Sequence, residues 1–173
     1  MVGVTRPPDD SVDRIVRAWA ARDPQLDASP LEVVGRLLLC AQHCEREILA
    51  ALAEFELSFA DFDVINTLRR RADPDGTNPT DLARSSLITS GAMTARLNRL
   101  ESAGLIERTP DAADRRAVRV RLTPGGERLA ERALVAVLAA DERFLDPLGR
   151  RQREALAGTL KDLLLPHEDA QPR

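Results

Sequence analysis

Four arginines crowd into the segment "TPDAADRRAVRVRLTPGGE", which covers residues 109–127. They are Arg115, Arg116, Arg119 and Arg121. The last two alternate with Val118 and Val120, so in an extended strand the arginines share one face and the valines share the other. Guanidinium groups bind phosphate oxygens through charge-assisted hydrogen bonds. The segment therefore predicts a hairpin that packs on its domain with one face and contacts a nucleic-acid backbone with the other.

The distribution of charge supports this prediction. The chain carries −3 overall, yet residues 84–128 contain nine arginines and five acidic residues, a local charge of +4, which leaves −7 for the rest. A basic module within an acidic chain is typical of a nucleic-acid binder.

A second set of polar side chains lies on a helix predicted over residues 90–104, "SGAMTARLNRLESAG". Met93, Leu97 and Leu100 share its apolar face. The opposite face offers groups that can bind base edges and phosphates. They are Ser90, Thr94, Ala95, Asn98 and Arg99. This face could instead be merely solvated, but the charge, the helix and the hairpin all agree with DNA contact.

The elements that must position these residues form a winged helix-turn-helix. A short helix over 79–87, capped by Asn78, precedes the polar helix across a tight turn. Two paired strands, "LIERT" and "AVRVRLT", follow. We expect the second helix to enter the major groove and the wing to reach a neighbouring minor groove or the backbone through Arg115 or Arg116. Asp114 is expected to fold back on a nearby arginine and hold the wing in shape.

Amphipathic helices flank this module, so the predicted fold class is mainly α, with a two-stranded wing and long dimerisation helices. Helices are expected over 11–23, 28–57, 58–71 (capped by Ser58), 124–146 and 150–165, with a frayed tail after them. Residues 1–57 would form the N-terminal helices, 58–123 the DNA-binding domain, and 124–173 the C-terminal dimerisation helices and tail.

Other classes of protein fit the sequence poorly. There is no glycine-rich phosphate loop and no nucleophile elbow, so we do not expect an enzyme. His43 and Glu47 offer two metal ligands where a structural zinc site needs four, so no metal or cofactor is expected. Cys40 and Cys44 fall in an apolar helical stripe, where cysteine is normally an inert small hydrophobe rather than an oxidant sensor. No apolar run approaches about 18 residues and the N-terminus is unlike a signal peptide, which predicts a cytoplasmic protein without a membrane partner.

The segment from "TDLARSSL" to "LTPGGERL" resembles the core of the MarR family of bacterial transcription regulators. The diagnostic piece is "DRRAVRVRLTPGG", and "RLESAGLIER" before it also fits. With its flanking helices the resemblance covers about residues 30–165. It implies a homodimer with one winged helix per subunit, bound to a pseudo-palindromic double-stranded DNA operator. It also implies that the protein is a repressor and that a small ligand releases it from the operator.

The helix before residue 30 resembles the branch of this family that responds to urate and related purines. That branch carries a Trp on the added helix, an Asp in the third helix, an Arg in the recognition helix and an Arg leading into the wing. Here these positions are Trp19, Asp63, Arg96 and Arg108, with Arg36 as a further candidate. The resemblance implies that Asp63 and Arg108 form an ion pair and that the ligand takes Arg96.

Each of these residues also has a simpler interpretation. Trp19 could be a core residue, Arg96 could touch phosphate, and Asp63 with Arg108 could be a purely structural pair. Within the family, a phenolic compound or an oxidant could replace urate as the effector. In a different class, the chain could be a helical dimer whose winged helix binds a protein partner.

Overall fold

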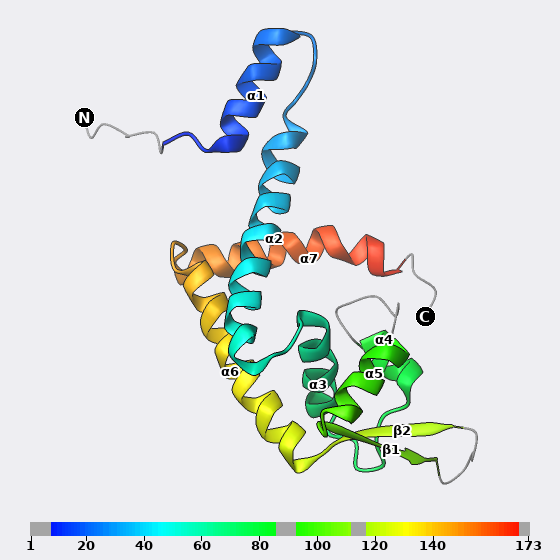
Figure 1. Ribbon diagram of the computed structural model, residues 1–173. Coiled ribbons are helices and arrows are strands. Elements are labelled where there is room, and N and C mark those ends of the chain that lie inside the picture. Colours follow the sequence, from blue (N-terminus) through cyan, green and yellow to red (C-terminus); the bar gives the residue numbers. More distant parts are fainter. Residues whose placement is uncertain (1–7, 86–92, 112–116, 170–173) are drawn as a thin grey trace. The chain divides into compact units, whose positions relative to one another are not determined.

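A computed structural model describes residues 8–85, 93–111 and 117–169. Its elements, in order, are α1 (Ser11–Arg22), α2 (Pro30–Leu52), η1 (Ala53–Phe55), α3 (Phe59–Arg71), α4 (Pro79–Ser85), α5 (Met93–Ser102), β1 (Ile106–Pro110), β2 (Val118–Leu122), α6 (Pro124–Leu145) and α7 (Arg150–Asp169) (Figure 1). The predicted fold class, mainly α with a two-stranded wing, is confirmed. In the described ranges, no helix combines the length and apolarity needed to span a bilayer.

Contacts divide the chain into two compact units, Met1–Arg46 and Glu47–Arg173. These units divide the chain by packing, whereas the three segments expected from the sequence divide it by proposed role. α6 belongs to the second unit because it packs along α3.

The first unit joins α1 to the beginning of α2. Asp10 caps α1 by accepting from the backbone N–H of Asp13, and the Asp13 carboxylate accepts from the backbone N–H of Asp10 in return. Arg36 of α2 donates to both carboxylates, at 2.8 Å to Asp10 Oδ2 and 2.7 Å to Asp13 Oδ1. Val12 is buried beside Gly35. An ionic cluster and the apolar contact of Val12 therefore link the two helices.

α2 ends earlier than the sequence predicts. Its apolar repeat was expected to continue as helix through Phe55, but the α-helix stops at Leu52 and residues Ala53–Phe55 form a 3₁₀ turn. Glu56 then has φ +55°, a left-handed conformation that ends the helical path. The tertiary packing explains the turn, because Phe55 and Leu57 are both buried in the core.

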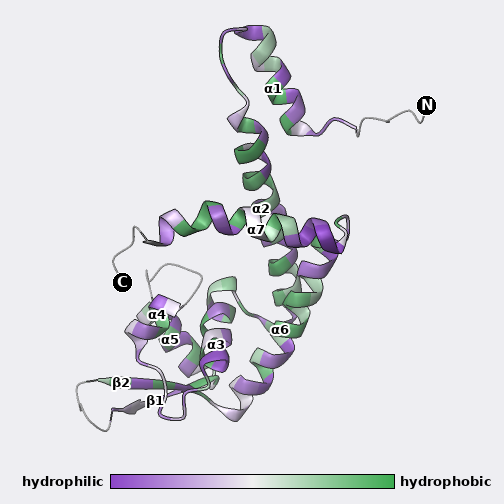
Figure 2. Cartoon of the chain, turned by 180° about the vertical axis from the view of Figure 1, so that it is seen from behind, coloured by the Kyte–Doolittle hydropathy of each residue, from purple (hydrophilic) through white to green (hydrophobic). Residues whose placement is uncertain are grey.

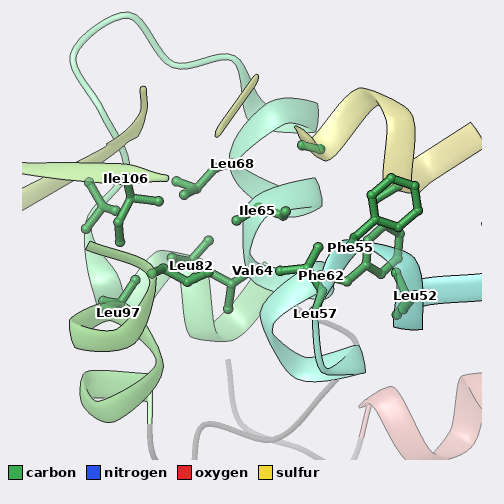
Figure 3. Packing of buried hydrophobic residues seen from close by; sticks show 14 of the residues in the cluster. Leu52, Phe55, Leu57, Phe62, Val64, Ile65, Leu68, Leu82, Leu97 and Ile106 are labelled. Atoms are coloured by element: carbon green, nitrogen blue, oxygen red, sulfur yellow. The ribbon is translucent and has the colours of Figure 1, made fainter. Parts of the chain in front are cut away.

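The hydrophobic core of the second unit is built around α3 (Figure 3). This helix contributes Phe62, Val64, Ile65 and Leu68. Side chains from several other elements close around them. They are Leu52, Phe55, Leu57, Leu82, Met93, Leu97, Leu100, Ile106, Val120, Ala130, Ala133 and Val137. Because the core is mostly aliphatic, helix and strand positions depend on close packing rather than on aromatic anchors.

The predicted helix starts are confirmed by their hydrogen bonds. Ser58 Oγ accepts from Asp61 N at 3.1 Å, Asn78 Oδ1 from Thr80 N at 2.7 Å, and Thr123 Oγ1 from Gly126 N at 3.0 Å. The sequence predicts a frayed tail after residue 165. This is wrong for residues 166–169, because α7 continues through Pro166 to Asp169. Proline near a helix end removes only one intrahelical bond, so the last turn can persist.

The two strands pair antiparallel, with Arg108 opposite Val120 and Ile106 opposite Leu122. Thr77 adds a bridge on the other edge of β2, exchanging two backbone hydrogen bonds with Val120 at 2.9 and 3.0 Å. Val120 is fully buried, as the alternation predicted, but Val118 is exposed. The valine face therefore packs on the domain at the base of the ribbon, and the packing ends before Val118.

Candidate nucleic-acid interface and effector residues

α5 presents the two faces expected of a recognition helix. Met93, Leu97 and Leu100 are buried in the core, while Thr94 and Asn98 are exposed. Gly104 has φ +67° and ends the helix in the left-handed conformation. Ser90 lies outside the described residues.

Arg99, also predicted on this polar face, is bound within the protein. Its Nη2 lies 2.5 Å from Asp61 Oδ1 and its Nε lies 3.1 Å from Asp61 Oδ2. The Asp61 carboxylate also accepts from Ser58 Oγ at 2.6 Å. The hydrogen bond and the charge of Asp61 raise the pKa of Arg99. The sequence did not reveal Asp61 as the partner of Arg99, because the two residues are far apart along the chain.

Arg108 ties β1 to α5. Its Nη2 donates to Asn98 Oδ1 at 2.7 Å, and its Nε lies 3.4 Å from Glu101 Oε2. Asn98 therefore accepts one hydrogen bond through its oxygen, and its amide N–H₂ remains as a donor to a base edge or phosphate. The implied Asp63–Arg108 pair stays a prediction.

The arginine face of β2 packs on the loop that connects α3 to α4. Arg119 lies 2.5 Å from Asp111 Oδ2 and donates to the Gly76 carbonyl at 3.2 Å. Arg121 donates to the Pro74 carbonyl at 3.2 Å and lies 3.4 Å from Glu107. The bond to Asp111 raises the pKa of Arg119. Both side chains thus brace the base of the wing.

Three of the predicted wing residues, Asp114, Arg115 and Arg116, fall outside the described part of the chain. Their predicted contacts with the backbone of DNA, and the shaping role of Asp114, stay predictions.

Two arginines that the sequence analysis did not single out hold the end of α4. Arg70 Nη2 donates to the Ser85 carbonyl at 2.7 Å, and Arg71 Nη1 donates to Ser85 Oγ at 2.9 Å. Cations favour the carbonyl end of a helix. The run "RRR" at the end of α3 was the available signal, because side chains clustered there can reach acceptors on a neighbouring element.

The two effector candidates in α3 and α5 are differently placed. Asp63 is buried, with 3% of its surface exposed. Arg96 is half-buried, and its Nη1 is enclosed with no hydrogen-bond acceptor among the described residues. An enclosed guanidinium N–H without an acceptor is costly, so this position favours an added acceptor.

The two effector candidates in the first unit are Trp19 on α1 and Arg36 on α2. Trp19 is 45% exposed, which speaks against the interpretation as a core residue. With Ile15, Ala18 and Arg22 it forms one open face of α1. Arg36 is engaged with Asp10 and Asp13, which raise its pKa.

The cysteines are less enclosed than their apolar stripe suggested. Cys40 is exposed and Cys44 is half-buried. Within the described ranges, no cluster of three or more His, Cys, Asp or Glu side chains is arranged to hold a metal ion.

The fold defines the class of protein: α4 and α5 form a helix-turn-helix, and β1 with β2 form its wing. Comparison with known proteins agrees. Residues 55–117 match the model of the MarR family. The HTH-type transcriptional regulator PecS of Dickeya dadantii is 32% identical over 149 residues, covering 86% of this chain and 90% of PecS. The chain belongs to the MarR family.

Solved structures of the family show the same architecture. A mutant MarR of E. coli complexed with operator DNA has a TM-score of 0.67 and 26% identity, covering 84% of this chain and 97% of that one. The Mycobacterium tuberculosis MarR family protein Rv2887, in complex with p-aminosalicylic acid, has a TM-score of 0.60 and 29% identity over 76% and 97% of the two chains. The relatives are named as transcriptional regulators and repressors, in line with the expectation of a regulator rather than an enzyme.

Proposed function

We propose that this chain is a homodimeric, cytoplasmic transcriptional regulator that binds double-stranded DNA and releases it when a small planar anion binds. The favoured effector is urate, xanthine or a similar compound, and the favoured mode is repression at a pseudo-palindromic operator. Two recognition helices related by a two-fold axis would reach half-sites about one helical turn apart.

The observation that carries the DNA-binding half is the two-faced character of α5. Its apolar face is locked into the core, and Thr94 and Asn98 face solvent on the other side. Hydroxyl and amide groups on an exposed helix suit base edges in the major groove. The wing residues Arg115 and Arg116 would add phosphate or minor-groove contacts.

The effector half rests on Arg96. Its enclosed Nη1 lacks an acceptor among the described residues, and an anionic ligand would supply one. The exposed indole of Trp19 offers a face suited to a planar ring. The ligand would disturb the pairing of Asp63 and Arg108 and so shift α5 and the wing. A coupling of about 1–3 kcal/mol, or roughly 5–150-fold in DNA affinity, is typical of such switches.

The test is a gel-shift titration on the DNA immediately upstream of this protein's own gene, with and without urate. We expect a specific shift that urate releases. Arg96→Gln and Trp19→Ala should keep the shift and lose the response to urate, because each removes one proposed ligand contact. Asn98→Ala should weaken the shift without urate.

The outcomes separate the two halves of the proposal. A shift that urate leaves intact would retain the regulator and reject urate as its effector. Absence of any shift at low salt, on this DNA and on nonspecific duplex, would reject DNA binding and favour a protein partner for the winged helix.

One comparison favours a second class of effector. Rv2887 was solved with p-aminosalicylic acid, a phenolic carboxylate. Such a ligand would also satisfy the buried Arg96 N–H through its carboxylate. Repeating the release assay with p-aminosalicylate in place of urate distinguishes the two, since the preferred effector should act at the lower concentration.

A further inference from the structure

The C-terminal half of α5 is tied to the first turn of α3 by three residues, Ser58, Asp61 and Arg99. The Asp61 carboxylate accepts two hydrogen bonds from Arg99, at 2.5 and 3.1 Å, and one from Ser58 Oγ at 2.6 Å. Both carboxylate oxygens are engaged. Asp61 also lies in the first helical turn, where the positive end of the helix dipole stabilises a negative charge.

Burial makes this contact difficult to exchange for a contact with DNA. Only 7% of the Asp61 side chain is exposed, compared with 58% of the Arg99 side chain. If Arg99 turned to a phosphate, it would leave a buried carboxylate without its cation, which is strongly unfavourable. A phosphate in solvent offers Arg99 no comparable enclosure, because exposed ion pairs contribute little.

We propose that Asp61 and Arg99 form a latch that positions the recognition helix, and that Arg99 supports DNA binding without itself contacting DNA. This inference rests on the DNA-binding function proposed above. The latch joins α5 to α3 just after the left-handed residue Glu56, where the chain arrives from α2 and η1. Asp61 and Arg99 are therefore positioning residues.

The variant Asp61→Asn tests the latch, because the two explanations predict opposite changes in DNA affinity. If Asp61 merely withheld Arg99 from DNA, removing its negative charge would release the arginine and tighten DNA binding. If the pair positions α5, the same variant loosens the helix and weakens binding, by roughly 2- to 30-fold for a coupling of this kind. Affinity is measured by fluorescence anisotropy on the DNA duplex that wild-type protein shifts.

Salt dependence gives a second test. Each phosphate contact contributes about one unit to the slope of log affinity against log salt concentration. Arg99→Gln should weaken binding and Arg99→Lys should weaken it less, while in both variants the slope stays at the wild-type value. Lysine keeps the charge but loses the two-pronged bond to the carboxylate. The Asp61→Asn/Arg99→Gln double variant should be no weaker than the weaker single variant.

Two further variants control for general effects of a substitution on charge and on folding. Arg143→Gln removes an exposed arginine on α6 and should leave affinity unchanged. Ser58→Ala keeps both charges and removes two hydrogen bonds, one to the Asp61 carboxylate and one from the Asp61 backbone N–H at the start of α3, so it serves if the Asp61 variant fails to fold. Tighter binding by Asp61→Asn, or a slope reduced by about one unit in Arg99→Gln, would overturn the latch.

Hydrogen exchange separates failure of the latch from failure of the proposed function. If wild-type protein binds no DNA, the proposed function fails, and the latch is then judged by amide protection across residues 93–102 alone. We expect protection there to fall at least several-fold in Asp61→Asn and Arg99→Gln, with no change in Arg143→Gln. Unchanged protection of α5 in the first two variants would reject the latch.

Discussion

At Gly126 the packing leaves no room for a side chain. A Cβ there would lie 1.9 Å from the Leu105 carbonyl oxygen. That carbonyl accepts from the backbone N–H of Thr123, so it cannot simply turn away. The glycine in the "LTPGG" motif thus lets α6 begin directly against the residue that leads into β1.

We therefore predict that Gly126→Ala lowers the free energy of unfolding by about 1–3 kcal/mol or more, as overpacking does. The neighbouring Gly125→Ala is the matched control. Its Cβ would meet Thr123 Oγ1 at an ordinary 3.6 Å, so it should be neutral or stabilise the helix by about 0.5–1 kcal/mol. Urea denaturation measures both; equal stabilities for the two variants would contradict the argument.

Residue identity predicted the caps better than it predicted the partners of charged side chains. Ser58 and Asn78 cap their helices as predicted, because a cap depends on backbone N–H groups two or three residues away. Arg99 and Arg119 instead bind Asp61 and Asp111. The Arg99 partner is distant in sequence, and no periodic pattern specifies such a contact.

At the scale of elements, the residue pattern of the wing predicted its strand correctly but did not predict what its arginines contact. The alternation of valine and arginine predicted strand β2 and its buried Val120. It could not reveal that the loop of residues 72–77 lies beside the arginine face and offers backbone carbonyls. The arginines therefore stabilise the ribbon as well as supplying positive charge.

The junction of α1 and α2 makes a prediction about pH. The pKa of Asp10 is lowered by the backbone N–H of Asp13 and then by Arg36, and that of Asp13 by the backbone N–H of Asp10 and then by Arg36. Because both folded pKa values lie below 3.8, their contribution to stability is complete above that pH and is lost as the pH falls through the lowered values.

Arg36→Gln should raise both pKa values toward, but not fully to, the ordinary value, since the backbone hydrogen bonds remain. Carboxyl NMR titration measures this directly. Asp27 is an internal control because its pKa is lowered by Ser29 and not by Arg36, so it should not move. If Asp10 and Asp13 titrated as in wild type, the ionic junction would not operate in solution.

At the scale of the whole molecule, the described chain leaves many large apolar side chains uncovered. Hydrophobic residues run along α7 in Figure 2, and Leu156, Leu160 and Leu163 are all exposed at helical spacing. The same applies to Val135 and Leu138 on α6. Sequence periodicity predicted such apolar stripes, but a stripe looks the same whether it faces the chain's own core or a second copy. Exposed apolar surface of this kind typically marks an interface.

We propose that this face of α7 is buried between two copies of the chain, as the predicted homodimer requires. Leu160→Glu should then shift the protein toward monomer in sedimentation velocity and weaken operator binding, because one subunit engages a single half-site. Gly158→Glu adds the same charge on the opposite side of α7, where an added side chain meets open space, so it should remain dimeric. A Leu160→Glu protein that sediments as wild type would place the dimer interface elsewhere.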